Sequence, residues 1–209
     1  MLIRYSHSGV TLIELMIGIA ILAVMILLAV PGFSAMIQNQ QIRTQAESIL
    51  NGLQLARAEA VKRNSVVNFQ LVGDLTAACA PAVAGKAWVV SVFDTTGLCD
   101  VATDQETKVT DAGFDPTINP LILEKRTVEG SLNADVMVED PGAAVIAFNG
   151  VGRVAPLAAV ATVINVTNPT GGACAPAGPM RCLDVVVEPG GQIKMCDPAL
   201  AATDTRSCF

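Results

Sequence analysis

The chain begins with a long apolar run that contains a single charged residue. From Val10 to Val30 the only charge is that of Glu14, and Pro31 follows directly. As an α-helix this run is about 31 Å long at 1.5 Å per residue, which matches a bilayer core of roughly 30 Å. The pattern therefore predicts a membrane-spanning helix. An acid at mid-bilayer costs on the order of 2.5–3.5 kcal/mol, so Glu14 is expected to have a specific use.

A second helical pattern follows this run. Apolar residues recur there at alternating steps of four and three, which places them on one face of a helix: Ile42, Ala46, Ile49, Leu53, Ala56 and Ala60. Arg43 with Glu47, and Glu59 with Arg63, have the i,i+4 spacing of ion pairs on the polar side. We expect this apolar stripe to pack under a sheet.

Two residues interrupt the helical pattern. Pro31 removes one backbone donor, so the helix either kinks or ends there, and the pattern that resumes beyond it favours a kink. Gly52 is expected to be a weak point that costs about 1 kcal/mol relative to alanine. The two helical patterns together predict a long N-terminal helix with a membrane-embedded half and an amphipathic half.

Eight short segments beyond the helix are rich in β-branched residues and separated by turn residues, which predicts strands. They are residues 66–72, 87–93, 121–128, 132–138, 145–148, 160–167, 183–188 and 192–196. Residues 94–120 are polar and contain two prolines, which predicts a long surface loop. A long helix followed by many short strands predicts an α+β fold with antiparallel sheets.

Charge and composition exclude several classes of function. The net charge of −6 over 209 residues argues against general binding to nucleic acid, which usually needs a basic face. The only histidine is His7. No metal-ligand cluster, nucleophile motif or phosphate-binding loop is evident, so we expect neither an enzyme nor a cofactor or metal. Gly150-Val151-Gly152-Arg153 superficially matches a dinucleotide-binding pattern, but Pro156 follows and no βαβ unit surrounds it, so a turn is expected.

Six cysteines lie downstream of the apolar run: Cys79, Cys99, Cys174, Cys182, Cys196 and Cys208. None forms a CxxC pair, and disulfides in an oxidising compartment such as the periplasm fit better than a zinc site. A hairpin turn at Pro189-Gly190-Gly191 favours Cys182–Cys196. Cys79–Cys99 could staple the loop between the first two strands, which leaves Cys174–Cys208 to tether the tail. The sequential pairing Cys174–Cys182 with Cys196–Cys208 stays open as the rival.

The residues that flank the apolar run indicate processing at its start. Arg4 and His7 precede the run, which predicts a cytoplasmic N-terminus and an outward-facing remainder. An ordinary signal-peptide cut after the run is disfavoured, because Pro31 directly follows Ala29-Val30. The alternative cut lies before the run, after Gly9.

A short charged leader, Gly9, Thr11-Leu12-Ile13-Glu14-Leu15 and an apolar helix resemble the type IV pilin and pseudopilin class. The resemblance implies that a prepilin peptidase cuts after Gly9 and methylates Val10, where the family usually has Phe or Met. It also implies that Glu14 pairs with a free N-terminal amine in a growing fibre, and that the helix can unwind near Pro31 in assembled fibres.

Residues 53–64, with Ala56-Arg57-Ala58-Glu59-Ala60 and Arg63 before the first strand, narrow the resemblance to the FimT/FimU and GspH group of minor pilins and pseudopilins. The resemblance covers residues 8–72 best. Two interpretations of the charges Arg57, Glu59, Lys62 and Arg63 stay open: a solvated helix end, or contacts that orient the helix against the domain.

The expected organisation has four parts: a leader at 1–9, a transmembrane and fibre-core helix at 10–33, its amphipathic half at 34–65, and a periplasmic β-rich domain at 66–209. The resemblance implies a minor pilin that primes or enters the pilus near its tip, with other pilins, the prepilin peptidase and the inner membrane as partners. The alternatives are a type II secretion pseudopilin and a DNA-binding minor pilin.

Some proteins of this group bind DNA through a C-terminal Gly-Arg-x-Arg element. At the matching place this chain has Gly191-Gln192-Ile193-Lys194, where one cation is lost and the other is lysine. The remaining candidates for a DNA contact are Arg153, Arg181, Lys194 and Arg206, whether clustered in the fold or scattered. We therefore do not favour DNA binding.

Overall fold

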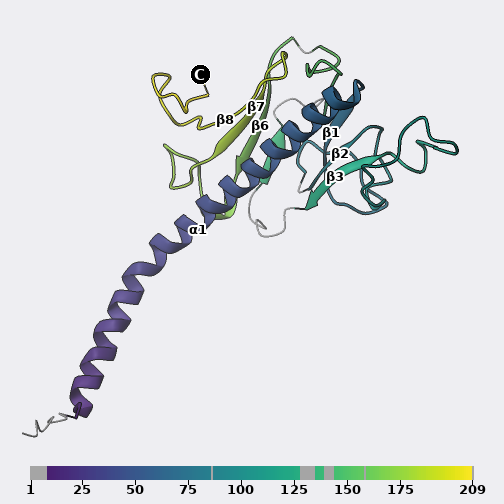
Figure 1. Cartoon of the computed structure of the whole chain (residues 1–209). Helices are drawn as coiled ribbons and strands as arrows, with labels where there is room; N and C mark the ends of the chain where they lie inside the picture. The colour runs from purple at the N-terminus through teal and green to yellow at the C-terminus, as the bar shows by residue number, and fades with distance from the viewer. Residues whose placement is uncertain (1–8, 86, 128–134, 139–143, 158, 209) are drawn as a thin grey trace, which may run out of the picture. The chain divides into compact units, whose positions relative to one another are not determined.

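The computed structural model describes residues 9–85, 87–127, 135–138, 144–157 and 159–208. Residues 1–8 of the expected leader lie outside the described residues. Residue 128 of one expected strand and residues 132–134 of another also lie outside them. The chain forms two compact units, Met1–Ile37 and Gln38–Phe209. The helix α1 (Leu12–Arg63) runs through both of them (Figure 1). It continues through Pro31, so the alternative of a helix end there is wrong.

Each of the eight segments expected to be extended contains a strand. In chain order the strands are β1 (Val67–Val72), β2 (Ala87–Ser91), β3 (Ile122–Thr127), β4 (Asp135–Val138), β5 (Val145–Phe148), β6 (Thr162–Thr167), β7 (Leu183–Val187) and β8 (Ile193–Cys196). The described residues between Asp94 and Pro120 form turns and no strand, as predicted.

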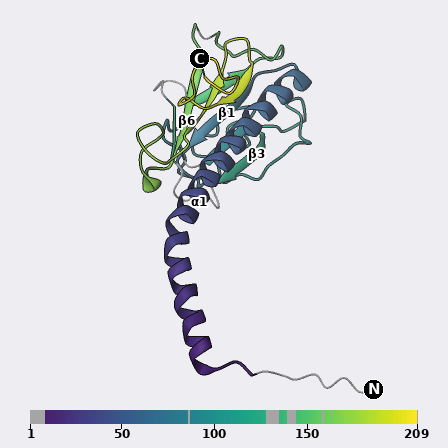
Figure 2. The same ribbon diagram turned by 90° about the vertical axis from the view of Figure 1, so that its left-hand side faces the viewer.

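The strands form two four-stranded antiparallel sheets, one with the order β3-β2-β1-β5 and the other with the order β4-β6-β7-β8. The second half of α1 lies across both sheets, as the two views in Figures 1 and 2 agree. The long helix packed on antiparallel sheets confirms the predicted α+β, pilin-like fold class.

The predicted stripe of α1 is the centre of the core of the second unit. All six of its residues have no exposed surface: Ile42, Ala46, Ile49, Leu53, Ala56 and Ala60. Burying one Ile or Leu side chain contributes about 1.5–3 kcal/mol, so this face of the helix supplies a large part of the drive to fold. The predicted ion pairs also form, with Arg43 Nε 2.8 Å from Glu47 Oε1 and Arg63 Nε 2.9 Å from Glu59 Oε2.

Gly52 has a packing role that the sequence pattern does not reveal. A Cβ at this position would lie 2.8 Å from Cε2 of Phe69 and 3.1 Å from two ring atoms of Trp88. The two rings pack together with centroids 5.7 Å apart, and the Trp88 indole N–H donates to Ser48 Oγ at 3.0 Å. Glycine is needed at this helical position because two aromatic rings lie where a side chain would be.

The β7–β8 hairpin turns at Pro189-Gly190-Gly191, as predicted. Gly191 has a φ of +86°, and its N–H donates to the carbonyl oxygen of Glu188 at 2.7 Å. Glu188 N–H in turn donates to Gln192 O at 2.9 Å, which closes a three-residue loop with glycine at its left-handed position. This turn fixes the register of the two strands.

That register explains why two of the three favoured disulfides are wrong. Cys196 lies opposite Asp184, two residues beyond Cys182 along β7, so Cys182 and Cys196 do not face each other. Cys174–Cys182 and Cys196–Cys208 form instead, with Cα atoms 5.5 and 5.0 Å apart. A local turn brings Cys174 to Cys182 through the Cys174–Met180 bridge, and the tail returns to β8 through the Asp197–Ser207 bridge. The alternative pairing of cysteines that are consecutive in the sequence is therefore the correct one for these two disulfides.

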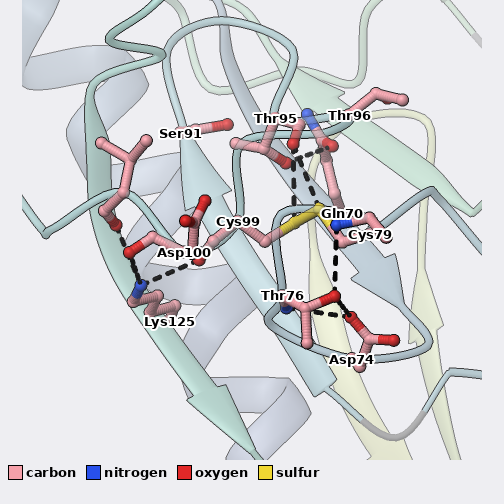
Figure 3. The surroundings of a disulfide bond; sticks show 12 residues. Gln70, Asp74, Thr76, Cys79, Ser91, Thr95, Thr96, Cys99, Asp100 and Lys125 are labelled. Atoms are coloured by element: carbon pink, nitrogen blue, oxygen red, sulfur yellow. Dashed lines mark hydrogen bonds between the residues drawn. A yellow bond between two sulfur atoms is a disulfide. The ribbon is translucent and has the colours of Figure 1, made fainter.

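The third favoured disulfide, Cys79–Cys99, is confirmed. Figure 3 shows it beside a buried pair in which Thr95 Oγ1 donates to Gln70 Oε1 at 2.7 Å. The Lys125 ammonium donates to three consecutive carbonyl oxygens of the loop between β2 and β3. They belong to Cys99, Asp100 and Val101, at 2.8, 3.2 and 2.9 Å. The disulfide thus joins the loop between β1 and β2 to the loop between β2 and β3. Hydrogen bonds tie the second of these loops to Gln70 of β1 and to Lys125 of β3.

The long loop is anchored to the edge of β3. Asp104 N–H donates to Ile122 O at 2.7 Å, and Gln105 Nε2 donates to Leu123 O at 3.0 Å. The Asp104 carboxylate accepts hydrogen bonds from the loop itself, including the backbone N–H groups of Glu106 and Thr107 at 3.1 and 3.0 Å. Hydrogen bonds from Thr107, first its side chain and then its backbone, lower the pKa of Asp104 to about 2.

We expect the substitution Gly52→Ala to destabilise the domain even though alanine is the better helix former. The added methyl group displaces the rings of Phe69 and Trp88, and overpacking of this kind costs about 1–3 kcal/mol. Thermal unfolding followed by the fluorescence of Trp88 measures this loss. Gly18→Ala is the control, because nothing lies within 4 Å of a Cβ at that helical position. Equal stability of the two variants would contradict the packing role of Gly52.

The loop at Asp104 is expected to keep its structure in acid. Because the pKa is lowered from 3.8 to about 2 in the folded state, the contribution of the carboxylate is fully present above about pH 4 and is lost as the pH falls through about 2. An NMR titration of the Glu106 and Thr107 amide protons checks this. Asp104→Asn should remove the transition near pH 2, and a transition near pH 4 in the wild-type chain would be the contrary result.

Candidate assembly site

The N-terminal end of α1 is capped by a residue that sequence reasoning did not single out. Glu14 N–H donates to Thr11 Oγ1 at 3.3 Å, and Leu15 N–H donates to the Thr11 carbonyl oxygen at 3.2 Å. Thr11 is therefore the N-cap, and the Thr-x-x-Glu spacing that could have revealed it is that of a capping box. Glu14 also lies in the first turn, where the helix dipole stabilises a negative charge. The fibre contact expected of Glu14 remains a prediction.

The expected processing site lies just ahead of this cap. Gly9 and Val10 precede the first helical residue, Leu12, and both are exposed. A Cβ at Gly9 would meet nothing within 4 Å. The peptide bond after Gly9 thus lies outside the helix, between two exposed residues.

The first unit presents an apolar surface that the unit itself does not cover. Its large apolar side chains between Val10 and Ile26, and between Phe33 and Ile37, are 53–81% exposed. Exposed apolar surface on this scale marks a site of contact with a membrane or with other proteins. Among the described residues, no helix meets the length and hydropathy of a membrane-crossing segment.

In the second unit, the charged end of α1 contacts the domain. Arg57 Nε donates to Gly152 O at 3.1 Å, and Arg63 Nη2 donates to Gln105 O at 3.3 Å. Partial burial acts to raise the pKa of Glu59, but hydrogen bonds from Lys62 and Arg63 lower it below its usual value. Arg57 and Arg63 thus contact the domain, whereas the Lys62 side chain is 68% exposed, and the orienting role stays a prediction.

The turn at 149–152 joins this helix end to both sheets. A Cβ at Gly150 would lie 2.9 Å from the Asn64 backbone, and one at Gly152 would lie 3.1 Å from Arg57 Nε. A Cβ at Gly191, at the tip of the β7–β8 hairpin, would overlap the carbonyl group of Gly152. The glycines that superficially match a dinucleotide-binding pattern therefore form a turn, as predicted, and they are needed for close packing.

The basic residues considered for DNA binding do not converge. Arg153 lies beside the hairpin tip, whereas Arg206 O accepts from Asp197 N–H at the opposite end of β8. Lys194 Nζ lies 3.5 Å from Glu188 Oε1, and the Arg206 guanidinium binds both carboxylate oxygens of Asp204 at 2.9 and 3.1 Å. These hydrogen bonds from Arg206 lower the pKa of Asp204 to about 2. Arg181 is held near the start of the packed helix through its backbone.

The surface of the second unit has a small polar hollow. The hollow measures about 220 Å³ and lies between α1 and β3, lined by Ser48, Asn51, Leu55, Trp88, Glu124 and Arg126. Its polar lining contains an internal ion pair, Arg126 Nε to Glu124 Oε1 at 3.2 Å. Within the described part of the chain, no three His, Cys, Asp or Glu side chains are grouped so that they could hold a metal ion.

Two protein-family models match the chain. The model of the type II transport protein GspH matches residues 45–191, and that of the prokaryotic N-terminal methylation motif matches residues 4–30. The second match spans Gly9, Val10 and Glu14, the residues expected to be processed or used in assembly. No curated protein matches the chain.

Several solved structures are similar to this one. The type IV minor pilin FimU of Pseudomonas aeruginosa has a TM-score of 0.48 at 15% identity, over 80% of this chain and 99% of the other. The minor pseudopilin EpsH of the Vibrio cholerae type 2 secretion system has a TM-score of 0.44 at 10% identity, over 77% and 99%. The solution structure of Escherichia coli GspH has a TM-score of 0.40 at 13% identity, over 80% and 93%.

The family follows from the extent and place of the family-model matches. The GspH model covers the packed half of α1 and the strands up to the hairpin tip, which is well over half of the chain. The methylation motif covers the start of the helix with its cap and its acid. This chain belongs to the GspH family of type II transport proteins and carries the prokaryotic N-terminal methylation motif.

Proposed function

We propose that the protein is a minor type IV pilin of the FimU kind that primes or enters the pilus near its tip. The observation that carries this proposal is the N-terminal arm, a helix with apolar side chains exposed on all the described parts of its surface and one carboxylate three residues after its cap. Such an arm buries its surface by packing into a bundle of similar helices. The chain then acts as a structural subunit and needs no catalytic residue or cofactor.

The proposed path begins in the inner membrane. There the arm anchors the chain, with the disulfide-bonded domain in the periplasm, where three disulfides can persist. Prepilin peptidase cuts after Gly9 and methylates the new N-terminal residue, Val10. The mature chain then enters the fibre, where Glu14 pairs with the N-terminal amine of a neighbouring pilin.

The pairing of Glu14 supplies a reason for its place in an apolar helix. Opposite charges about 4 Å apart attract by roughly 4 kcal/mol at an effective dielectric constant near 20. That attraction offsets the cost of holding the acid at membrane depth, but only when a neighbouring amine lies at the right height along the fibre. Glu14 would thus set the register between subunits.

A second candidate function is a minor pseudopilin of a type II secretion system. The match of the GspH family model over residues 45–191 favours it. The two functions share processing, membrane anchoring and assembly, and differ in the fibre that receives the subunit. DNA uptake is a third candidate that the internal pairing of Lys194 and Arg206 disfavours.

Glu14→Ala should leave cleavage after Gly9 intact and lower the amount of the protein in sheared pili by about tenfold or more, because the charge pair is lost. Immunoblots of membranes and of sheared fibres measure the two quantities. Thr11→Val is the matched control, since it removes the cap hydroxyl but keeps the carboxylate. Normal incorporation of Glu14→Ala would refute the pairing role. Absence of the wild-type chain from pili, together with impaired protein secretion in its deletion strain, would favour the pseudopilin.

The domain from residue 38 onward is expected to bind duplex DNA only weakly at physiological salt, with a Kd in the non-specific range of about 10⁻⁴–10⁻⁶ M. The reason is that Lys194 and Arg206 already have acidic partners. Fluorescence anisotropy with labelled duplex DNA at several salt concentrations tests this. Submicromolar, salt-sensitive binding that is lost in Arg153→Ala would instead establish the DNA-uptake function.

A further inference from the structure

The loop closed by Cys174–Cys182 has its own internal order. Ala175 N–H donates to Met180 O at 2.8 Å, and Gly178 N–H donates to Cys174 O at 3.1 Å. Met180 is 1% exposed, so the loop contributes a side chain to the core. The disulfide closes the loop over a sequence separation of 8 residues, and it therefore cannot extend when it is pulled.

This loop grips the first turn of α1 in the second unit. Asn39 Oδ1 accepts the Arg181 N–H at 2.7 Å, and Asn39 Nδ2 donates to Pro179 O at 3.5 Å, so one side-chain amide pairs with the loop backbone at two points. Two residues further along the helix, Asn168 Nδ2 donates to Gln41 Oε1 at 3.2 Å. Asn168 is 1% exposed, whereas Gln41 is half-buried, so this hydrogen bond is partly shielded from water.

The backbone at Gly171 also lies close to the helix, at Gln38. A Cβ at Gly171 would overlap both Gln38 Oε1 and Met180 Sδ. Gly171 N–H donates to Asn168 Oδ1 at 3.2 Å and to its carbonyl oxygen at 3.0 Å. The segment from Asn168 to the disulfide therefore fits against the helix at several points.

These contacts occur where the packed half of the helix begins. Gln38 is the first residue of the second unit. Ile37, just before it, is 57% exposed, whereas Ile42, the first residue of the buried stripe, has no exposed surface. The polar contacts at Gln38 and Asn39 thus lie about one turn before the first core residue, and the contact at Gln41 lies directly before it.

We propose that the segment 168–182 is a mechanical latch that stops the helix from being peeled off the two sheets when the N-terminal arm is pulled. The inference rests on the proposed function, because a subunit of a fibre transmits tension through its arm. Pro31 lacks a backbone donor, and a short exposed helical turn is only marginally stable by itself. Loosening that starts at Pro31 meets the latch at Gln38 before it reaches the core.

The experiment is hydrogen–deuterium exchange of the full chain in detergent micelles, read by mass spectrometry over α1. Asn39→Ala removes both bonds to the loop and should speed exchange over residues 38–46 by about five- to tenfold, since exchange follows local opening. Asn51→Ala is the matched control, an asparagine on the same helix that lies three turns further along and is exposed. Unchanged fluorescence of Trp88 shows that the core is intact.

A second pair of variants tests the latch with substitutions outside the helix. Gly171→Ala places a methyl group against Gln38 and Met180, and should speed exchange over the same residues. Gly190→Ala is its control, because nothing lies within 4 Å of a Cβ there.

The proposal is overturned if Asn39→Ala and Gly171→Ala exchange like the wild-type chain. It is also overturned if exchange rises equally along the helix to Arg63, because that result would mean general destabilisation. The measurement involves no fibre, so a positive result stands even if the chain proves absent from pili, in which case only the proposed function fails.

Discussion

The burial of one face of α1 against both sheets is the interaction on which the rest of the structure depends. Neither four-stranded sheet is wide enough to enclose a core by itself, and the helix supplies the shared apolar surface. Ile49, Leu53 and Ala56 lie at the centre of this surface. Phe69 and Trp88 approach the helix closely at Gly52. Removing the helix would expose the inner face of each sheet to water.

The two halves of the same helix have opposite relations to solvent, and this contrast is the physical basis of the proposed function. Beyond Gln38 the helix buries its apolar face within its own chain. Before Gln38 the large apolar side chains that the structure describes, between Val10 and Ile26 and between Phe33 and Ile37, are exposed. In the proposed function, similar helices of other subunits cover these side chains on assembly.

The polar contacts then determine how the sheets are held on the helix. Arg57 fixes the turn at Gly152 at one end of the packed helix, and Asn39 fixes the loop at Arg181 near the other end. Both contacts use a side chain of the helix and a backbone group of a loop. Such contacts leave no pattern in the sequence, because backbone groups are the same at every position and only the fold brings one particular carbonyl or N–H within reach.

The sequence by itself determined the elements. Apolar residues at alternating steps of four and three predicted the buried stripe, and β-branched runs predicted the eight described strands. Gly9 with Thr11–Glu14 indicated the pilin and pseudopilin class, which residues 53–64 narrowed to the group that includes GspH. Only the tertiary structure decided the disulfides at Cys174, Cys182, Cys196 and Cys208, the need for Gly52, and the loop that grips Asn39. The physical reason is that periodicity reports which side of an element faces the core, whereas pairing across loops depends on strand register and on close backbone approaches between residues far apart in the chain.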